Sequence, residues 1–159
     1  MAKGNEIIVS AEPQGRFIEG IVSGTPKPGT VMQVKAATAA DASGKHTWEV
    51  YNAAADGNQR LIAVLLPDAL SGQLASTAYV TATRCFLYVP IAGEELNMLY
   101  ANISGTSDAF AVADIMMVDD GTGKLVATTG TPESEPFICL EAQTALTADA
   151  LVWSMFTGY

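Results

Sequence analysis

The sequence predicts an all-β fold made of small β-barrel lobes, and three observations lead to this. About ten short segments are rich in Val, Ile, Leu, Tyr and Phe. Turns that contain Gly, Pro, Asn or Asp separate these segments at intervals of roughly 8–15 residues. No long stretch carries a sustained helical period. Short strands with turns between them are typical of sandwiches and barrels, so we expect about ten strands and little helix.

The composition limits the classes of function. A chain of 159 residues corresponds to one domain or two small ones. Charged residues make up only 16% of it, below the roughly 25% of ordinary soluble domains. The surface is therefore rich in small polar residues, or a partner covers part of it. The net charge of −9 and the scattered basic residues argue against a nucleic-acid partner, which needs clustered Lys and Arg.

The sequence also argues against a membrane partner. No apolar run reaches the roughly 18 residues that span a bilayer. The start of the chain lacks the apolar region of a signal peptide, so we expect synthesis in the cytoplasm.

Residues 1–14 form a polar start with one apolar triplet, Ile7-Ile8-Val9. Two interpretations are open for this segment. It is a flexible N-terminal arm, as chain termini often are, or the triplet adds as a strand to the edge of a neighbouring sheet.

The first lobe is expected at residues 15–80. A loop rich in Gly and Pro, residues 23–29, ends its first strand. Two later segments alternate apolar and polar residues, which is typical of half-buried strands. Residues 61–66 are uniformly apolar, which indicates a strand buried on both faces. We expect strands at residues 16–22, 30–35, 47–51 and 61–66.

The second lobe is expected at residues 81–157 and begins with the stretch Arg84 to Ile103. Apolar runs at residues 85–89 and 96–103 flank a polar break with one Gly, which predicts a β-hairpin. Asp119-Asp120-Gly121-Thr122-Gly123 predicts the tight turn of a further hairpin. We expect the remaining strands at residues 114–118, 124–128, 137–142 and 151–156.

Candidate catalytic residues are few. His46 is the single histidine, so any Ser/His/Asp or Cys/His site would have to use it. It has no local motif, and a solvated loop histidine is the better interpretation. One His and two distant Cys give no zinc spacing. We therefore expect no catalytic residues, no metal and no cofactor.

The acidic pairs also favour structural roles. Glu94-Glu95 and Glu133/Glu135 lie in predicted loops, and a glycosidase would need two carboxylates at a defined separation across a sugar cleft. The Asp119 turn lacks the ligand spacing of an EF-hand. Surface turn charges are the simpler interpretation of both features.

Two further questions stay open at this point. Cys85 and Cys139 each lie in an apolar run, where a free cysteine is usually a small buried hydrophobe. A disulfide between them would need neighbouring strands. The tyrosines are spread over several strands and fit either a sugar-stacking platform or core packing.

Four blocks of the sequence resemble a known family. They are Gly24–Val31, which contains Lys-Pro-Gly-Thr-Val, Leu61–Gly72, Tyr88–Asn97 and Thr144–Trp153. In this order they are similar to the head decoration proteins of tailed bacteriophages, the lambda-type capsid cement proteins. The resemblance covers residues 15–157.

The resemblance implies β-barrel or β-tulip-like lobes and a virion structural protein rather than an enzyme. Such a protein would bind the outer surface of the major capsid protein lattice as a homotrimer and stabilise the expanded head. The triplet Ile7, Ile8 and Val9 would be a possible capsid-contact arm. A carbohydrate- or receptor-binding β module of a virion is the alternative.

Overall fold

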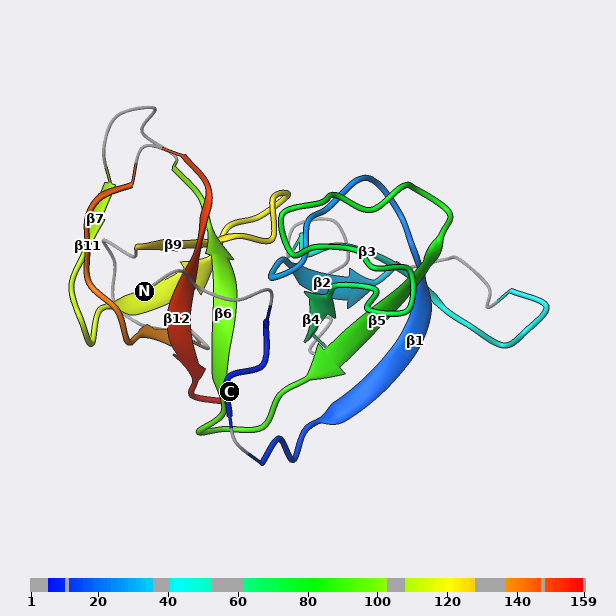
Figure 1. Cartoon of the computed structure of the whole chain (residues 1–159), viewed down its shortest axis with the longest axis horizontal. Coiled ribbons are helices and arrows are strands. Elements are labelled where there is room, and N and C mark those ends of the chain that lie inside the picture. The colour runs from blue at the N-terminus through cyan, green and yellow to red at the C-terminus, as the bar shows by residue number, and fades with distance from the viewer. Residues whose placement is uncertain are drawn as a thin grey trace.

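The computed structural model describes residues 6–10, 12–35, 41–52, 62–102, 108–127, 137–146 and 148–158. Within these ranges the chain forms twelve strands and no helix (Figure 1). Ten of the strands form two closed five-stranded barrels, and the other two form a small separate sheet. The predicted all-β class with small barrel lobes is therefore confirmed.

The first barrel contains the first five strands of the chain in the order β1-β3-β2-β4-β5. β1 pairs antiparallel with β5 along most of its length and parallel with β3 at its end, which closes the barrel. The strands are β1 (Arg16–Val22), β2 (Val31–Val34), β3 (Thr47–Val50), β4 (Ile62–Leu66) and β5 (Arg84–Val89).

The second barrel has the order β10-β12-β6-β9-β8. β12 and β6 form its longest antiparallel pair, from Ala150↔Tyr100 to Met155↔Glu95. Its strands are β6 (Glu95–Tyr100), β8 (Ile115–Val118), β9 (Leu125–Ala127), β10 (Phe137–Cys139) and β12 (Ala150–Phe156). β7 (Asp108–Phe110) and β11 (Gln143–Leu146) pair with each other as the small separate sheet.

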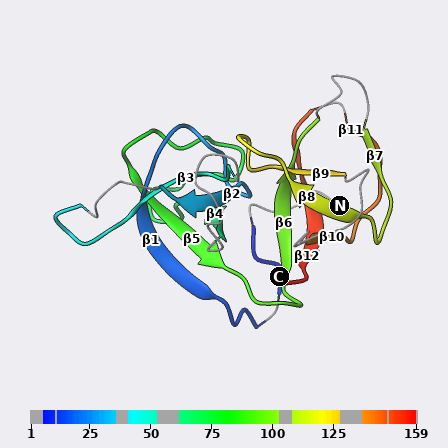
Figure 2. The ribbon, with the colours of Figure 1, turned by 180° about the vertical axis from the view of Figure 1, so that it is seen from behind.

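The predicted hairpin between residues 84 and 103 is wrong. β5 pairs with β1 and β4, whereas β6 pairs with β12 and β9, and the two strands lie in different barrels (Figures 1 and 2). The polar break at residues 90–94 therefore connects the barrels and is not a hairpin turn. β5 is the last strand of the first barrel, and β6 is the first strand of the second. The boundary between the barrels therefore lies at this connection and not between residues 80 and 81, where the sequence placed it.

The second predicted hairpin is confirmed. β8 and β9 pair antiparallel from Met116↔Ala127 to Val118↔Leu125. Asp119 and Lys124 close the turn with a backbone hydrogen bond of 2.8 Å.

β4 is buried on both faces, as its uniformly apolar sequence predicts. Ala63 and Leu65 lie in the core inside the first barrel. Ile62, Val64 and Leu66 belong instead to a core that also contains the interior residues of the second barrel. The outer face of β4 is therefore the apolar interface between the barrels.

Backbone hydrogen bonds also join the two barrels. The carbonyl of Gly123, in the β8–β9 turn, accepts a bond of 2.8 Å from the amide of Val31, and the amide of Gly121 donates to the carbonyl of Tyr51 over 2.9 Å. The amide of Leu99 in β6 donates to the carbonyl of Gly29 over 3.0 Å. These bonds fix the orientation of one barrel on the other.

We predict that Gly123→Ala destabilises the protein far more than Gly121→Ala, by about 3 kcal/mol against about 1 kcal/mol. Both glycines have a positive φ, so both substitutions strain the backbone. Only at Gly123 would a Cβ also lie 2.3 Å from the carbonyl oxygen of Val31, whereas at Gly121 nothing lies within 4 Å. Urea unfolding of the two variants measures the difference. Equal losses would contradict the tight docking of this turn.

Candidate functional site

The connection between β4 and β5, residues 67–83, is a long loop whose first part is held by Asp68. The Asp68 carboxylate accepts hydrogen bonds from the amides of Leu70 at 3.0 Å and Ser71 at 3.3 Å. The amide of Asp68 donates to the side-chain oxygen of Gln73, and the amide of Gln73 donates to the carbonyl of Asp68, both over 3.0 Å. Asp side chains stabilise turns in this way, so this part of the loop is fixed locally.

Tyr79 fixes the second part of the same loop. Its ring is buried in the core of the first barrel, and its hydroxyl donates a hydrogen bond of 2.8 Å to the carbonyl of Leu66. Burial raises the pKa of Tyr79 to about 12, so the phenol remains a neutral donor at physiological pH. The amide of Tyr79 also donates to the carbonyl of Pro26 over 2.9 Å.

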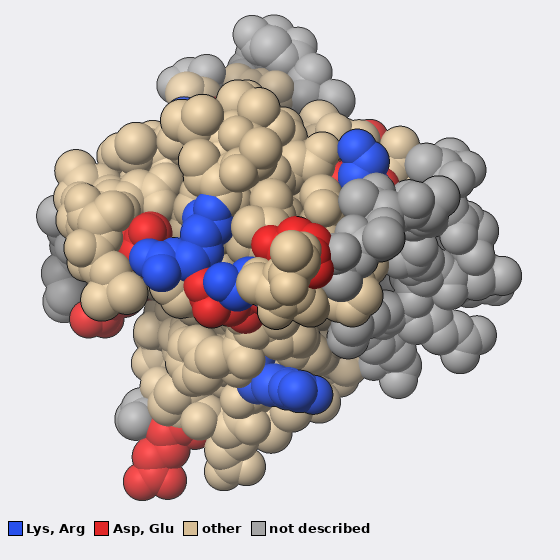
Figure 3. Space-filling model, turned by 90° about the vertical axis from the view of Figure 1, so that its right-hand side faces the viewer, with Lys and Arg blue, Asp and Glu red and all other residues tan. Residues whose placement is uncertain are grey.

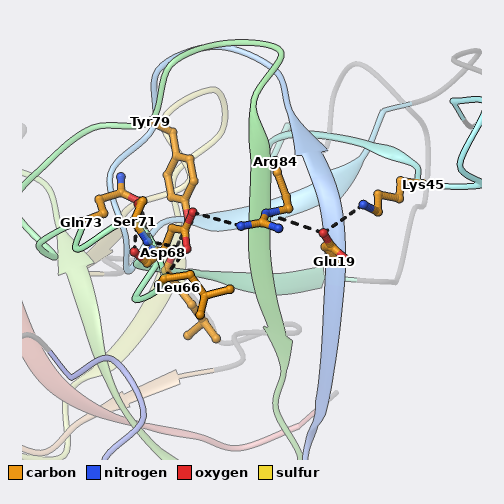
Figure 4. A network of polar contacts seen from close by, with 9 residues as sticks. Glu19, Lys45, Leu66, Asp68, Ser71, Gln73, Tyr79 and Arg84 are labelled. Carbon is orange, nitrogen blue, oxygen red and sulfur yellow. Dashed lines mark hydrogen bonds and ion pairs between the residues drawn. The ribbon is translucent and has the colours of Figure 1, made fainter.

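A row of ion pairs runs from this loop across two strands (Figure 4). Asp68 lies 3.7 Å from Arg84 on β5, Arg84 lies 3.7 Å from Glu19 on β1, and Glu19 lies 2.9 Å from Lys45. Apart from Asp68, these side chains are partly exposed, and each such pair contributes little to stability. Together they link the base of the loop to the barrel wall.

The loop nevertheless presents apolar side chains to solvent. Leu70 is 80% exposed, Val80 67% and Leu74 50%. Leu74 and Val80 also line a shallow depression together with Thr77 and Thr83. We call Leu70, Leu74 and Val80 the apolar loop surface. Leu74 and Val80 share the depression, whereas Leu70 lies elsewhere on the same loop. Exposed apolar side chains on a loop that is held in place are available for contact with a partner protein, so this loop is the candidate functional site.

Sequence reasoning missed this surface. Leu70, Leu74 and Val80 are separated by turn-forming residues, and this spacing does not distinguish exposed side chains from buried ones. Only the path of the loop outside the barrel determines their exposure.

The structure places the Ile7–Val9 triplet along β6. Ile8 pairs antiparallel with Leu96. The carbonyl of Ile7 accepts a hydrogen bond of 2.7 Å from Asn97, and the amide of Val9 donates to Glu95 over 2.9 Å. The strand-addition interpretation therefore holds, with the chain's own second barrel as the partner. For residues 6–10 the flexible-arm interpretation is wrong.

This placement changes what the arm can contact. Ile7 is only 2% exposed and belongs to the core shared by the barrels, and Ile8 is half-buried. Of the three residues expected as a capsid-contact arm, only Val9 is exposed in this arrangement.

Glu94 is buried and serves as an acceptor for several donors. One carboxylate oxygen accepts hydrogen bonds from the Tyr88 hydroxyl and from the amides of Gln14 at 2.6 Å and Gly15 at 3.0 Å. The other accepts from the amide of Ile91 at 2.8 Å. Burial alone would raise the pKa of Glu94, but these hydrogen bonds outweigh it and hold the pKa below its usual value. Glu94 thus fixes the segment before β1 to the connection between the barrels.

Of the other candidate carboxylates, the structure describes Glu95 and Asp119, and each has a structural hydrogen bond. Glu95 accepts a hydrogen bond of 3.2 Å from the indole nitrogen of Trp153. Asp119 accepts one from the hydroxyl of Thr122 within its own turn. The Glu133/Glu135 pair lies outside the described residues.

The histidine and the cysteines also lie apart. His46 is exposed just before β3. Cys85 and Cys139 are buried, free and in different barrels, so the disulfide that the sequence left open is absent. Burial raises the pKa of the Cys85 thiol to about 12, which keeps it protonated and unreactive.

Most tyrosines of the suggested sugar-stacking platform are not available at the surface. Tyr79, Tyr88 and Tyr100 are buried in the cores. Tyr51 is half-buried, and Tyr159 lies outside the described residues. Tyr79, Tyr88 and Tyr100 therefore pack the interior and cannot belong to an exposed row.

No group of three His, Cys, Asp or Glu side chains that could hold a metal occurs in the part of the chain that the structure describes. The same residues contain no helix long and apolar enough to cross a membrane. In comparisons with known proteins, no family model matches the chain and no curated protein matches its sequence.

We predict that Glu94→Gln lowers stability at neutral pH and weakens the loss of stability on acidification. The folded-state pKa of Glu94 lies below its ordinary value. Its contribution is therefore present above the unfolded-state pKa and lost as the pH falls through the folded-state pKa. Urea unfolding between pH 7 and pH 3 measures both effects. Glu12→Gln, at an exposed position, is the control and should leave the profile unchanged. An unaltered profile for Glu94→Gln would contradict this role.

Proposed function

We propose that the protein is a non-enzymatic decoration protein of a tailed-phage head. It binds the outer surface of the major capsid protein lattice as a homotrimer and stabilises the expanded head. One observation carries the proposal. Leu70, within the Leu61–Gly72 block that resembles lambda-type decoration proteins, is exposed on a loop that Asp68 holds in place.

A fixed apolar loop suits this role for an energetic reason. Ordering a mobile loop on binding costs free energy for every residue that loses conformational freedom. A loop already held by Asp68 and Tyr79 avoids much of this cost. Covering a leucine side chain contributes about 1.5–3 kcal/mol, and a trimer would repeat this contact three times.

The same proposal explains how binding stabilises a head. A ligand that binds only the expanded lattice stabilises that state in proportion to its occupancy and affinity. The low share of charged residues fits a protein whose surface is partly covered in the assembly. The apolar loop surface replaces Ile7 and Ile8 as the proposed lattice contact, because those side chains are already packed within the chain.

The direct test mixes the purified protein with expanded heads that lack decoration protein and measures co-sedimentation. Saturable binding in multiples of three copies, with heads that then resist heating, is the expected result. No binding at micromolar protein would overturn the proposal. Sedimentation velocity of the free protein reports whether the trimer forms before the protein meets the lattice.

We predict that Leu70→Asp weakens binding to the heads by at least about tenfold, because it places a charge where an apolar side chain would be covered. Val112→Asp is the matched control, since Val112 is also exposed and apolar but lies in the turn between β7 and β8, outside the apolar loop surface. Both variants should fold, which circular dichroism checks. Equal affinities for the two variants would show that the loop is not the contact.

A further inference from the structure

β1 has one edge that no described strand covers over most of its length. β5 pairs with β1 from Arg16 to Ile21. On the opposite edge β3 pairs only at the end of β1, at Ile21↔Thr47 and Val22↔Trp48. Figures 1 and 2 show the first half of β1 flanked by β5 on one side and by no described strand on the other.

The hydrogen bonds identify which backbone groups face this open edge. In an antiparallel ladder the N–H and C=O of one residue point to the same side, and successive residues alternate. The amide of Val22 donates toward the β5 side, to Thr83, whereas the amides of Ile21 and Ser23 donate to His46 and Trp48. By this alternation, the backbone groups of Phe17 and Glu19 point to the open edge.

A depression with a buried unpaired donor adjoins this edge. Residues of the first half of β1, the end of β2, the loop before β3 and Trp48 line it. Trp48 is 2% exposed, and its indole N–H has no acceptor among the residues that the structure describes. A buried donor without a partner costs about 1–3 kcal/mol, so an incoming carbonyl or carboxylate oxygen within reach would be bound favourably.

The charge of this site is opposite to that of the whole chain. Arg16, Lys45 and His46 line the depression, and Glu19 is its single acidic residue. Glu19 is already paired with Lys45 and Arg84. Figure 3 shows the side of the molecule that lies on the right in Figure 1, the side of β1, where Lys and Arg side chains lie among the acidic ones. In a chain of net charge −9, this local excess of basic side chains favours an acidic partner.

We propose that the open edge of β1 is a binding site for an extended acidic peptide segment of another protein. The segment adds as a strand and forms backbone hydrogen bonds with Phe17 and Glu19. Phe17, which is 60% exposed and has its ring tilted against that of Tyr88, supplies an apolar contact beside it. Strand addition of this kind takes affinity from the main chain and specificity from the side chains. The site lies outside the apolar loop surface and does not depend on the proposed capsid role.

The first test titrates the ¹⁵N-labelled protein with a capped hexapeptide of alternating Val and Asp, followed by NMR. The expected result is saturable shifts of the Phe17 and Glu19 amides and of the Trp48 indole N–H. The matching Val/Lys peptide should bind at least about tenfold more weakly. A Val/Asp peptide methylated at its backbone nitrogens should not bind. No shift at these groups at millimolar peptide, or equal binding of the Val/Lys peptide, would overturn the proposal.

The second test uses Glu19→Pro, which removes an amide that faces the open edge and leaves the ladder to β5 intact. Proline is tolerated at strand edges for this reason. Glu19→Thr is the matched control, because it loses the same carboxylate and keeps the amide. We expect Glu19→Thr to keep most of the affinity and Glu19→Pro to lose at least about tenfold.

Two outcomes of the second test would contradict the proposal. Equal binding by the two variants would show that the backbone edge is not used. Self-association of the wild-type protein that Glu19→Pro abolishes would show that a second copy of this chain, and not an acidic partner, occupies the edge.

Discussion

The packing of β4 between the two barrels is the constraint on which the rest of the structure depends. Ala63 and Leu65 fill the first barrel, while Ile62, Val64 and Leu66 pack with the interior of the second. Each buried side chain of this size contributes about 1.5–3 kcal/mol. Without the second barrel, the outer face of β4 would be an exposed apolar strip. The barrels are therefore parts of one folded unit.

The polar contacts between the barrels follow from this packing. Once β4 lies against the second barrel, the β8–β9 turn comes close enough for Gly123 to accept a hydrogen bond from Val31. The arm runs along β6 and places Ile7 in the same shared core. Glu94 then satisfies the amides of Gln14 and Gly15 where the chain turns toward β1. Buried polar groups need such partners, and here they lie where the two barrels meet.

The two proposed binding sites are both consequences of how the first barrel is closed. β4 and β5 are neighbouring antiparallel strands joined by a long loop, and Asp68 and Tyr79 hold that loop with Leu70 outside. β3 pairs with β1 at the end of β1, so the first half of β1 keeps an edge that no described strand covers. Proteins commonly block or cover such edges, and a partner strand would do so here.

Local sequence determined which segments become strands and which become turns, because alternation, apolar runs and Gly-rich breaks act over a few residues. The uniformly apolar run at residues 62–66 and the Asp119 turn were predictable for this reason. Pairing was not. Taken alone, the pattern around residues 84–103 fits a hairpin. In the structure, however, β5 pairs with β1 and β6 pairs with β12, and both partners are distant in the sequence.

The same limit applies to the site. The Ile7–Val9 triplet indicates a strand but not the strand with which it pairs. No local sequence pattern predicts that Leu70 is exposed. Only the tertiary structure decided these points, because closing each barrel determines which edges and side chains are left for solvent.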